Sequence, residues 1–126
     1  MLSPIECVKA VVACDNGRDS AGYRRLLHDD YVSFVHGKES TVGAVAEVEA
    51  LARWWQAASD VHLEPLVMVE SGGLVTLRYT LTGTNDGEFF GRPATGRRFH
   101  LENCTLLQVQ QGRVHRAYRY SDTMGL

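Results

Sequence analysis

Apolar residues recur at helical spacing in the first half of the 126-residue chain and alternate with polar residues in the second half. The first pattern predicts helices over 4–16, 20–28 and about 41–59, with a short strand at 31–35. The second predicts strands over 61–69, 74–82, 97–110 and 114–121, with a Gly- and Asn-containing loop over 83–96. Helices followed by hairpin-linked strands predict an α+β fold, in which one antiparallel sheet carries helices on one face.

Length and composition are those of a single globular domain spanning 1–126, with 44% apolar and 22% charged residues. The net charge of −2 argues against nucleic-acid binding, which needs a concentrated excess of basic residues. No apolar run approaches the roughly 20 residues that span a bilayer, and the N-terminus lacks the features of a secretory signal. We therefore expect a cytoplasmic protein that binds neither nucleic acid nor membrane.

Motifs for metals, nucleotides and nucleophilic hydrolysis are missing from the sequence. The five histidines form no HxH or HExxH pair, and the chain has no GxSxG elbow, phosphate-binding loop or GxGxxG. The three cysteines form no CxxC and are expected to be reduced, small apolar residues. We expect no metal and no cofactor.

Alternation with a period of two sorts the two long strands of the second half into inner and outer faces. In 97–110, the more apolar set contains Asn103 and Thr105, which would be polar groups in a buried wall and need partners from protein, water or ligand. In the last strand, the set that we assign to the inner face comprises Val114, Arg116, Tyr118, Tyr120 and, just beyond the strand, Asp122.

A carboxylate beside aromatic rings in a poorly solvated pocket suits proton transfer, because burial disfavours its charged form. Asp122 is a candidate for this role, and the alternative is a solvated turn residue. Tyr118 and Tyr120 are either core aromatic residues with one wet end or catalytic groups. Trp55 continues the apolar stripe of the third helix, which leaves the adjacent Trp54 for a pocket mouth or a partner.

The segment 82–98, TGTNDGEFFGRPATGRR, closely resembles the connection between central strands in SnoaL-like polyketide cyclases. The turn at 112–114, the ending YRYSDTMGL over 118–126 and the opening helices that lead to 30–32 are similar to the same family. The resemblance covers most of the chain and implies a nuclear transport factor 2-like cone. In this fold a curved antiparallel sheet wraps around the N-terminal helices and encloses an apolar pocket.

For function, the resemblance implies a cofactor-independent enzyme of small-molecule, polyketide or other secondary metabolism. It would use acid/base catalysis by a pocket aspartate, which falls on Asp122, to close a ring by an intramolecular aldol reaction. The resemblance also implies a small hydrophobic or aromatic substrate and a homodimer formed through the outer face of the sheet. Tyr118 stands where the family usually carries Trp, and Asn85 where it often carries His.

Under this hypothesis, Asp122 removes a proton next to a carbonyl, and the developing oxyanion accepts hydrogen bonds from Asn103, Tyr118 or a rim group such as His36. The pocket holds the substrate folded so that the reacting carbons meet. We expect His36 to be the second catalytic residue. The predicted substrate-contacting residues are Asn103, Tyr118, Tyr120, Trp54, Phe34 and Arg116.

Two alternatives remain open from the sequence. An epoxide hydrolase or isomerase on the same fold would need two carboxylates bridged by an arginine around a water, for which Arg78, Arg116, Asp30 and Asp60 are the available residues. A non-catalytic dimeric ligand-binding module is the other alternative, since fold alone does not fix function. A cavity filled with side chains, or Asp122 directed to bulk solvent, would favour the latter.

Overall fold

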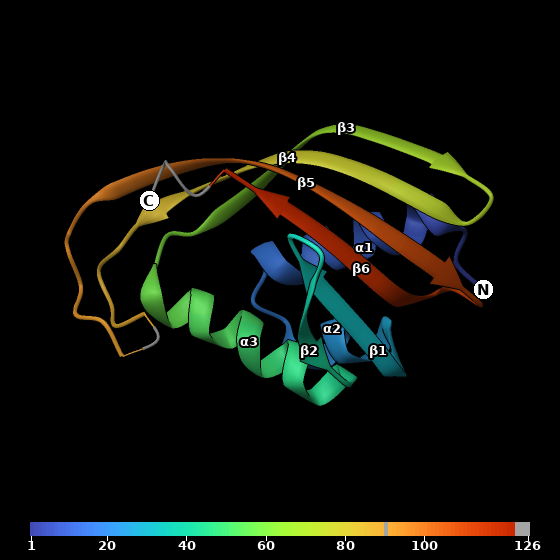
Figure 1. Ribbon diagram of the computed structural model, residues 1–126, viewed down its shortest axis with the longest axis horizontal. Helices are drawn as coiled ribbons and strands as arrows, with labels where there is room; N and C mark the ends of the chain where they lie inside the picture. The colour runs from blue at the N-terminus through green and yellow to red at the C-terminus, as the bar shows by residue number, and fades with distance from the viewer. Residues whose placement is uncertain (90, 123–126) are drawn as a thin grey trace.

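The computed structural model of the chain describes residues 1–89 and 91–122 (Figure 1). Its elements are α1 (Pro4–Asn16), α2 (Ser20–Arg25), β1 (Leu27–Val35), β2 (Lys38–Val42), α3 (Ala44–Ala57), β3 (His62–Ser71), β4 (Leu74–Thr84), β5 (Arg98–Gln110) and β6 (Arg113–Ser121). Among the described residues, six strands form one sheet in the order β2-β1-β6-β5-β4-β3. The long strands arch over the helices, which confirms the predicted α+β cone (Figure 1).

The first helix begins where the sequence predicts. The Ser3 hydroxyl accepts a hydrogen bond from the Glu6 N–H (3.2 Å), and the Glu6 carboxylate accepts one from the Ser3 N–H (2.9 Å). This reciprocal cap, followed by Pro4 in the first turn, satisfies the helix start. Within the described part of the chain, no helix has both the length and the apolar character of a membrane span.

The predicted elements around residues 26–43 are the least accurate. The second helix ends at Arg25, because Leu27 already belongs to β1, and the third begins at Ala44. Residue Thr41 is part of β2, an edge strand that the sequence did not predict. β2 is mostly exposed and polar, as is common for a sheet edge, so it lacks the apolar alternation that marks a half-buried strand.

A β-bulge in β6 reverses the facing that alternation predicts. Val109 of β5 pairs with Val114, but the preceding Gln108 pairs with Arg116, which leaves His115 as an extra residue on β6. An extra residue moves every later side chain to the opposite face. The inward assignment from Arg116 onward is therefore wrong. The residues that face the helices after the bulge are Ala117, Arg119 and Ser121, and those on the opposite side are Tyr118, Tyr120 and Asp122.

The facing predicted for β5 is confirmed. Its buried set lies on the concave side of the sheet and comprises Phe99, Leu101, Asn103, Thr105, Leu107 and Val109. Leu107 and Val109 belong to one hydrophobic cluster with Val8 of α1 and other helical residues, and the concave face forms the core. Phe99 and Leu101 belong to a second cluster with Ala58, directly after α3. Polar groups on this face are therefore held in a largely apolar environment.

Candidate functional site

An aromatic-walled cavity of about 380 Å³ lies between the end of α3 and the loop 85–98. The ring of Trp54 lies 4.8 Å from Phe89 and 6.2 Å from Phe99, measured between centroids. The neighbouring Trp55 is buried and donates its indole N–H to the Asp15 carboxylate (3.0 Å). The structure thus places Trp55 in the core and Trp54 in the cavity wall, as predicted. The lining consists of Trp54, Ala57, Ala58, Asn85, Phe89, Arg92, Pro93, Thr95, Arg97, Arg98 and Phe99.

Asn85 holds the loop that forms one side of this cavity. Its Nδ2 donates to the carbonyls of Ala57 (3.2 Å) and Gly87 (3.0 Å), and its Oδ1 accepts from the N–H (2.9 Å) and the hydroxyl (3.0 Å) of Thr95. These bonds use the whole capacity of the amide. At Gly87 an added Cβ would lie 2.0 Å from the carbonyl oxygen of Gln56, so the loop packs directly on the end of α3. Asn85 therefore has a structural role.

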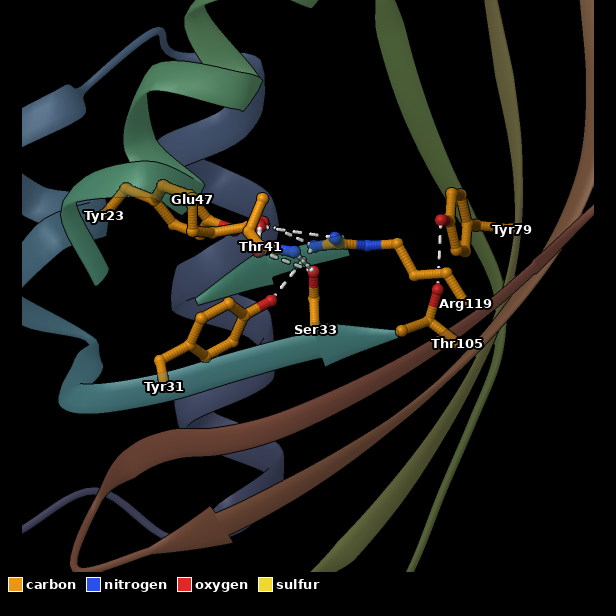
Figure 2. Close-up of polar contacts among 8 residues, drawn as sticks. All are labelled: Tyr23, Tyr31, Ser33, Thr41, Glu47, Tyr79, Thr105 and Arg119. Atoms are coloured by element: carbon orange, nitrogen blue, oxygen red, sulfur yellow. Dashed lines mark hydrogen bonds and ion pairs between the residues drawn. The ribbon is translucent and has the colours of Figure 1, made fainter. Parts of the chain in front are cut away.

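Polar side chains interrupt the concave face where β4, β5 and β6 pair. Asn103 of β5 lies between Tyr79 of β4 and Ser121 of β6, and Thr105 pairs with Arg119. Paired residues project to the same face of a sheet, so these side chains are neighbours. The Tyr79 and Thr105 hydroxyls lie 3.1 Å apart (Figure 2). We call the five residues Tyr79, Asn103, Thr105, Arg119 and Ser121 the concave polar patch.

Arg119 extends from β6 across the interior to Glu47 of α3 (Figure 2). Its Nη2 lies 2.6 Å from the Glu47 carboxylate, which also accepts hydrogen bonds from the hydroxyls of Tyr23 (2.6 Å) and Thr41 (2.8 Å). The Glu47 side chain is 4% exposed, whereas that of Arg119 is 29% exposed. The pair thus joins the sheet to the helical layer.

The charges of this ion pair stabilise each other. Burial alone would raise the pKa of Glu47, but the Arg119 guanidinium and the hydrogen bonds from Arg119, Tyr23 and Thr41 hold it below its usual value. Burial likewise opposes the charge on Arg119, yet the Glu47 carboxylate raises the pKa of Arg119 well above its ordinary value. Glu47 therefore stays ionised with both oxygens engaged, which suits a structural role better than proton transfer.

Asn103 has unused hydrogen-bonding capacity inside the fold. It is 6% exposed, and its side-chain oxygen has no hydrogen-bond partner within residues 1–89 and 91–122. Buried polar atoms are normally paired, and leaving one unpaired costs about 1–3 kcal/mol. The sequence correctly placed Asn103 on the inner face, and its unpaired oxygen can accept a hydrogen bond from a hydroxyl or other donor of a ligand.

The structure places Asp122 in a different hollow, of about 350 Å³, whose lining includes outward-facing Tyr120 as well as Asn103 and Ser121 of the concave polar patch. Asp122 is exposed, and its N–H donates to the Glu102 carbonyl (3.0 Å). The expectation that the concave pocket shields Asp122 is therefore wrong, and the bulge at His115 is the cause. The hollow is lined by His36, Arg78, Glu102, Asn103, Cys104, Tyr120, Ser121 and Asp122.

His36 shares this hollow with Asp122. It is exposed in the turn between β1 and β2, where its φ is +51°. Its Nε2 accepts a long hydrogen bond from the Ser121 N–H (3.4 Å), and its ring centroid lies 6.0 Å from that of Tyr120. The two predicted catalytic residues are thus brought together, but outside the aromatic-walled cavity.

The remaining predicted substrate contacts are also on the outer side of the sheet. Phe34 and Tyr118 stack with their ring centroids 5.0 Å apart and their planes at 9°. Tyr120 is 47% exposed. Arg116 donates to the main-chain carbonyl of Asp30 (2.9 Å). Of the predicted contacts, the structure therefore places Trp54 in the aromatic-walled cavity and Asn103 in the concave polar patch.

The sequence analysis missed the charged groups of the interior. Glu47 lies on α3 among apolar residues, and its position on the inner side of the helical stripe was the available signal. Asp15, near the end of α1, is a second carboxyl of this region and is half-buried, and its pKa is raised by burial although the Trp55 hydrogen bond opposes this. The inward position of Arg119 could not be read from alternation because of the bulge.

The family model and two curated relatives indicate one family. The chain matches the model of the SnoaL-like polyketide cyclases over residues 5–126. It is 30% identical over 133 residues to aklanonic acid methyl ester cyclase DnrD of Streptomyces peucetius, covering 99% of this chain and 88% of the relative. It is 32% identical over 133 residues to aklanonic acid methyl ester cyclase DauD of Streptomyces sp. (strain C5), with coverages of 98% and 80%.

A solved structure from Pseudomonas putida KT2440 has the same fold, with a TM-score of 0.88 at 18% identity and coverages of 99% and 96%. The family match spans nearly the whole described chain, and the architecture agrees with it. The chain therefore belongs to the SnoaL-like polyketide cyclase family and is a polyketide cyclase-like enzyme.

Proposed function

We propose that this enzyme closes a ring in a polyketide ester by a cofactor-independent intramolecular aldol reaction. The observation that carries the proposal is the buried Asn103 side chain, whose Oδ1 has no partner within residues 1–89 and 91–122 and which lies on the same face of β5 as Phe99 of the aromatic cavity. The two residues are four positions apart, about 13 Å along the strand. Flat aromatic rings pack well against Trp54 and its neighbours. The relatives named as aklanonic acid methyl ester cyclases support this substrate class.

The proposed reaction conserves all atoms of the substrate. A base removes a proton from the carbon next to a carbonyl, and the resulting enolate carbon attacks a second carbonyl of the same molecule. A carbon–carbon bond forms, the attacked oxygen becomes an alkoxide, and this oxygen takes up a proton. The Asn103 Nδ2 donates a hydrogen bond to an oxygen that gains negative charge, and one such donor is worth about 100- to 1,000-fold in rate. Holding the two carbons together supplies further acceleration.

Asp122 is the proposed proton-transfer group. Its support is the family resemblance of the chain's ending and its place directly after Ser121, the register partner of Asn103. Asp122 and Asn103 also line the same hollow of about 350 Å³, together with His36. Glu47 is a weaker candidate, because Arg119 neutralises its charge and its oxygens are already bonded.

The experiment that tests this function is an assay with aklanonic acid methyl ester, using chromatography to separate the cyclised isomer. We expect turnover without added cofactor and after treatment with a chelator. Asn103→Leu should lower kcat/KM about 100-fold, because it removes the oxyanion donor. The same change should not lower the unfolding temperature, because it also removes the unpaired buried oxygen. Failure to cyclise this ester or related polyketide esters would contradict the proposal, as would an Asn103→Leu variant of normal activity.

The hydrolase alternative has less support. Asp30 faces His115, with 3.2 Å between Oδ2 and Nε2, and Asp60 lies 4.0 Å from Arg98. These two carboxylates therefore do not meet around Arg78 or Arg116. Glu47 does pair with an arginine, but its engaged oxygens leave no position for an attacking water.

We also propose a homodimer formed through the outer face of the sheet. The stacked Phe34–Tyr118 pair lies on this face. Leu66 and Val69 of β3 are 46% and 58% exposed, which is a high exposure for large apolar side chains. Sedimentation equilibrium should give twice the chain mass, and Tyr118→Glu should shift it toward the monomer. A wild-type chain that sediments as a monomer at high concentration would contradict this proposal.

A further inference from the structure

The mouth of the aromatic-walled cavity carries unpaired positive charge. Its described lining contains Arg92, Arg97 and Arg98 but no carboxylate. Arg98 lies 4.0 Å from Asp60. The guanidinium groups of Arg92 and Arg97 make no hydrogen bond or ion pair with the rest of the described chain. Two cations are therefore available beside an aromatic wall.

The main chain holds Arg92 next to this wall. Phe89 and Arg92 exchange two backbone hydrogen bonds of 3.0 Å, across a turn in which Gly91 has a φ of +80°. Residues paired in this way project to the same side, and the Phe89 ring contacts Trp54. The Arg92 side chain therefore leaves the turn on the same side as the aromatic wall.

The main chain of Arg97, like that of Arg92, is held by two hydrogen bonds. Its carbonyl accepts from the Asn85 N–H (2.8 Å), and its N–H donates to the Thr95 hydroxyl (3.2 Å). Asn85 is itself tied to the end of α3 through the Ala57 carbonyl. Both arginines thus start from a fixed backbone, which lowers the entropic cost of binding a ligand.

Carboxylates close to the mouth already have other partners. Asp60 accepts from the N–H (2.6 Å) and the hydroxyl (3.0 Å) of Thr84, and Asp86 accepts from Ser59. Glu88 belongs to the loop but does not line the cavity. The charge of Arg92 and Arg97 is therefore not neutralised by the cavity's own residues.

We propose that this cavity binds an aromatic ligand that carries a delocalised anionic oxygen group, either a carboxylate or an ionised phenol or enol. The ring system packs on Trp54, Phe89 and Phe99, and the anionic group accepts hydrogen bonds from Arg92 and Arg97. Planar guanidinium groups match such oxygen anions and also stack on aromatic rings. The identification of this ligand as substrate or product rests on the proposed function, whereas the binding preference does not.

The test is calorimetric titration with two matched pairs of probes at low and high salt. One pair is naphthalene-2-carboxylate and its neutral carboxamide, and the other is 2-hydroxy-1,4-naphthoquinone, ionised at neutral pH, and its methyl ether. The anion of at least one pair should bind about tenfold tighter than its neutral partner at low salt, and the preference should shrink at high salt. The pair that shows the preference distinguishes a carboxylate from an ionised enol.

Two variants test whether Arg92 and Arg97 cause the preference for the anionic probe. Arg92→Gln combined with Arg97→Gln should abolish it, whereas Arg113→Gln, at the exposed first residue of β6, should leave it unchanged. Equal affinities within both pairs, no binding of any probe, or a preference that survives the double substitution would overturn the proposal. A binding preference without ester cyclisation would instead contradict the proposed function alone.

Discussion

The two faces of β6 carry charged residues in opposite situations. On the inner face, Arg119 is joined to the buried Glu47 carboxylate at 2.6 Å. Directly after the end of β6, on the outer side, Asp122 is exposed in a hollow together with His36. One strand therefore supplies a charge with a structural role and a charge that remains accessible. The extra residue at His115 decides which side chain lies on which face.

The largest effect on stability is expected from breaking the inner pair. Glu47→Leu should lower the free energy of unfolding by about 3–5 kcal/mol, because it leaves the Arg119 charge uncompensated in the interior. Urea unfolding measures this loss. Glu49→Leu on the same helix is exposed and serves as the control, with an expected change within about 0.5 kcal/mol. A Glu47→Leu variant as stable as the wild type would show that the ion pair is not structural.

The Glu47–Arg119 pair also predicts a smaller effect on the free energy of unfolding, which depends on pH. Because Arg119 lowers the pKa of Glu47 in the folded state, the ionised carboxylate contributes stability above its unfolded pKa of about 4.3. This contribution is lost as the pH falls through the lower folded value. The difference in unfolding free energy between the wild type and Glu47→Gln should therefore shrink in acid. A difference that is constant from neutral to acidic pH would contradict this assignment.

Substitution of Asp15 should change the free energy of unfolding least, and in the opposite direction to substitution of Glu47. Burial raises its pKa, so its charged form is disfavoured in the fold, and its contribution to stability falls as the pH rises through the raised value. Asp15→Asn keeps an acceptor for the Trp55 indole, so it should slightly raise the free energy of unfolding at neutral pH. A clear destabilisation at neutral pH would show that the charge itself is needed.

Local patterns predicted much of the fold. The Ser3-Pro4 start of α1 was predictable because a helix cap depends on neighbouring residues. The inward position of Asn103 was predictable because β5 alternates without interruption. The apolar stripe assigned Trp55 to the core and left a pocket mouth or a partner for Trp54, which the structure places in the cavity wall.

The prediction that Asp122 faces the concave side of the sheet was wrong for a physical reason. A bulge arises from the pairing of two strands, and nothing within residues 113–121 alone shows that His115 is extra. The interior pair was missed for a related reason, because Glu47 and Arg119 lie 72 positions apart and meet only when α3 packs under the sheet. The polar edge strand β2 gave no alternation to detect.

The most direct test of the account compares kcat/KM for Asp122→Asn and Glu47→Gln on the same polyketide ester. Asp122→Asn should lower it roughly 100-fold or more, because it removes the proton-transfer group, and should leave the unfolding free energy unchanged. Glu47→Gln should mainly lower stability. Normal turnover by Asp122→Asn, together with loss of turnover in a folded Glu47→Gln enzyme, would contradict the proposed role of Asp122 and move the chemistry to the Glu47–Arg119 pair.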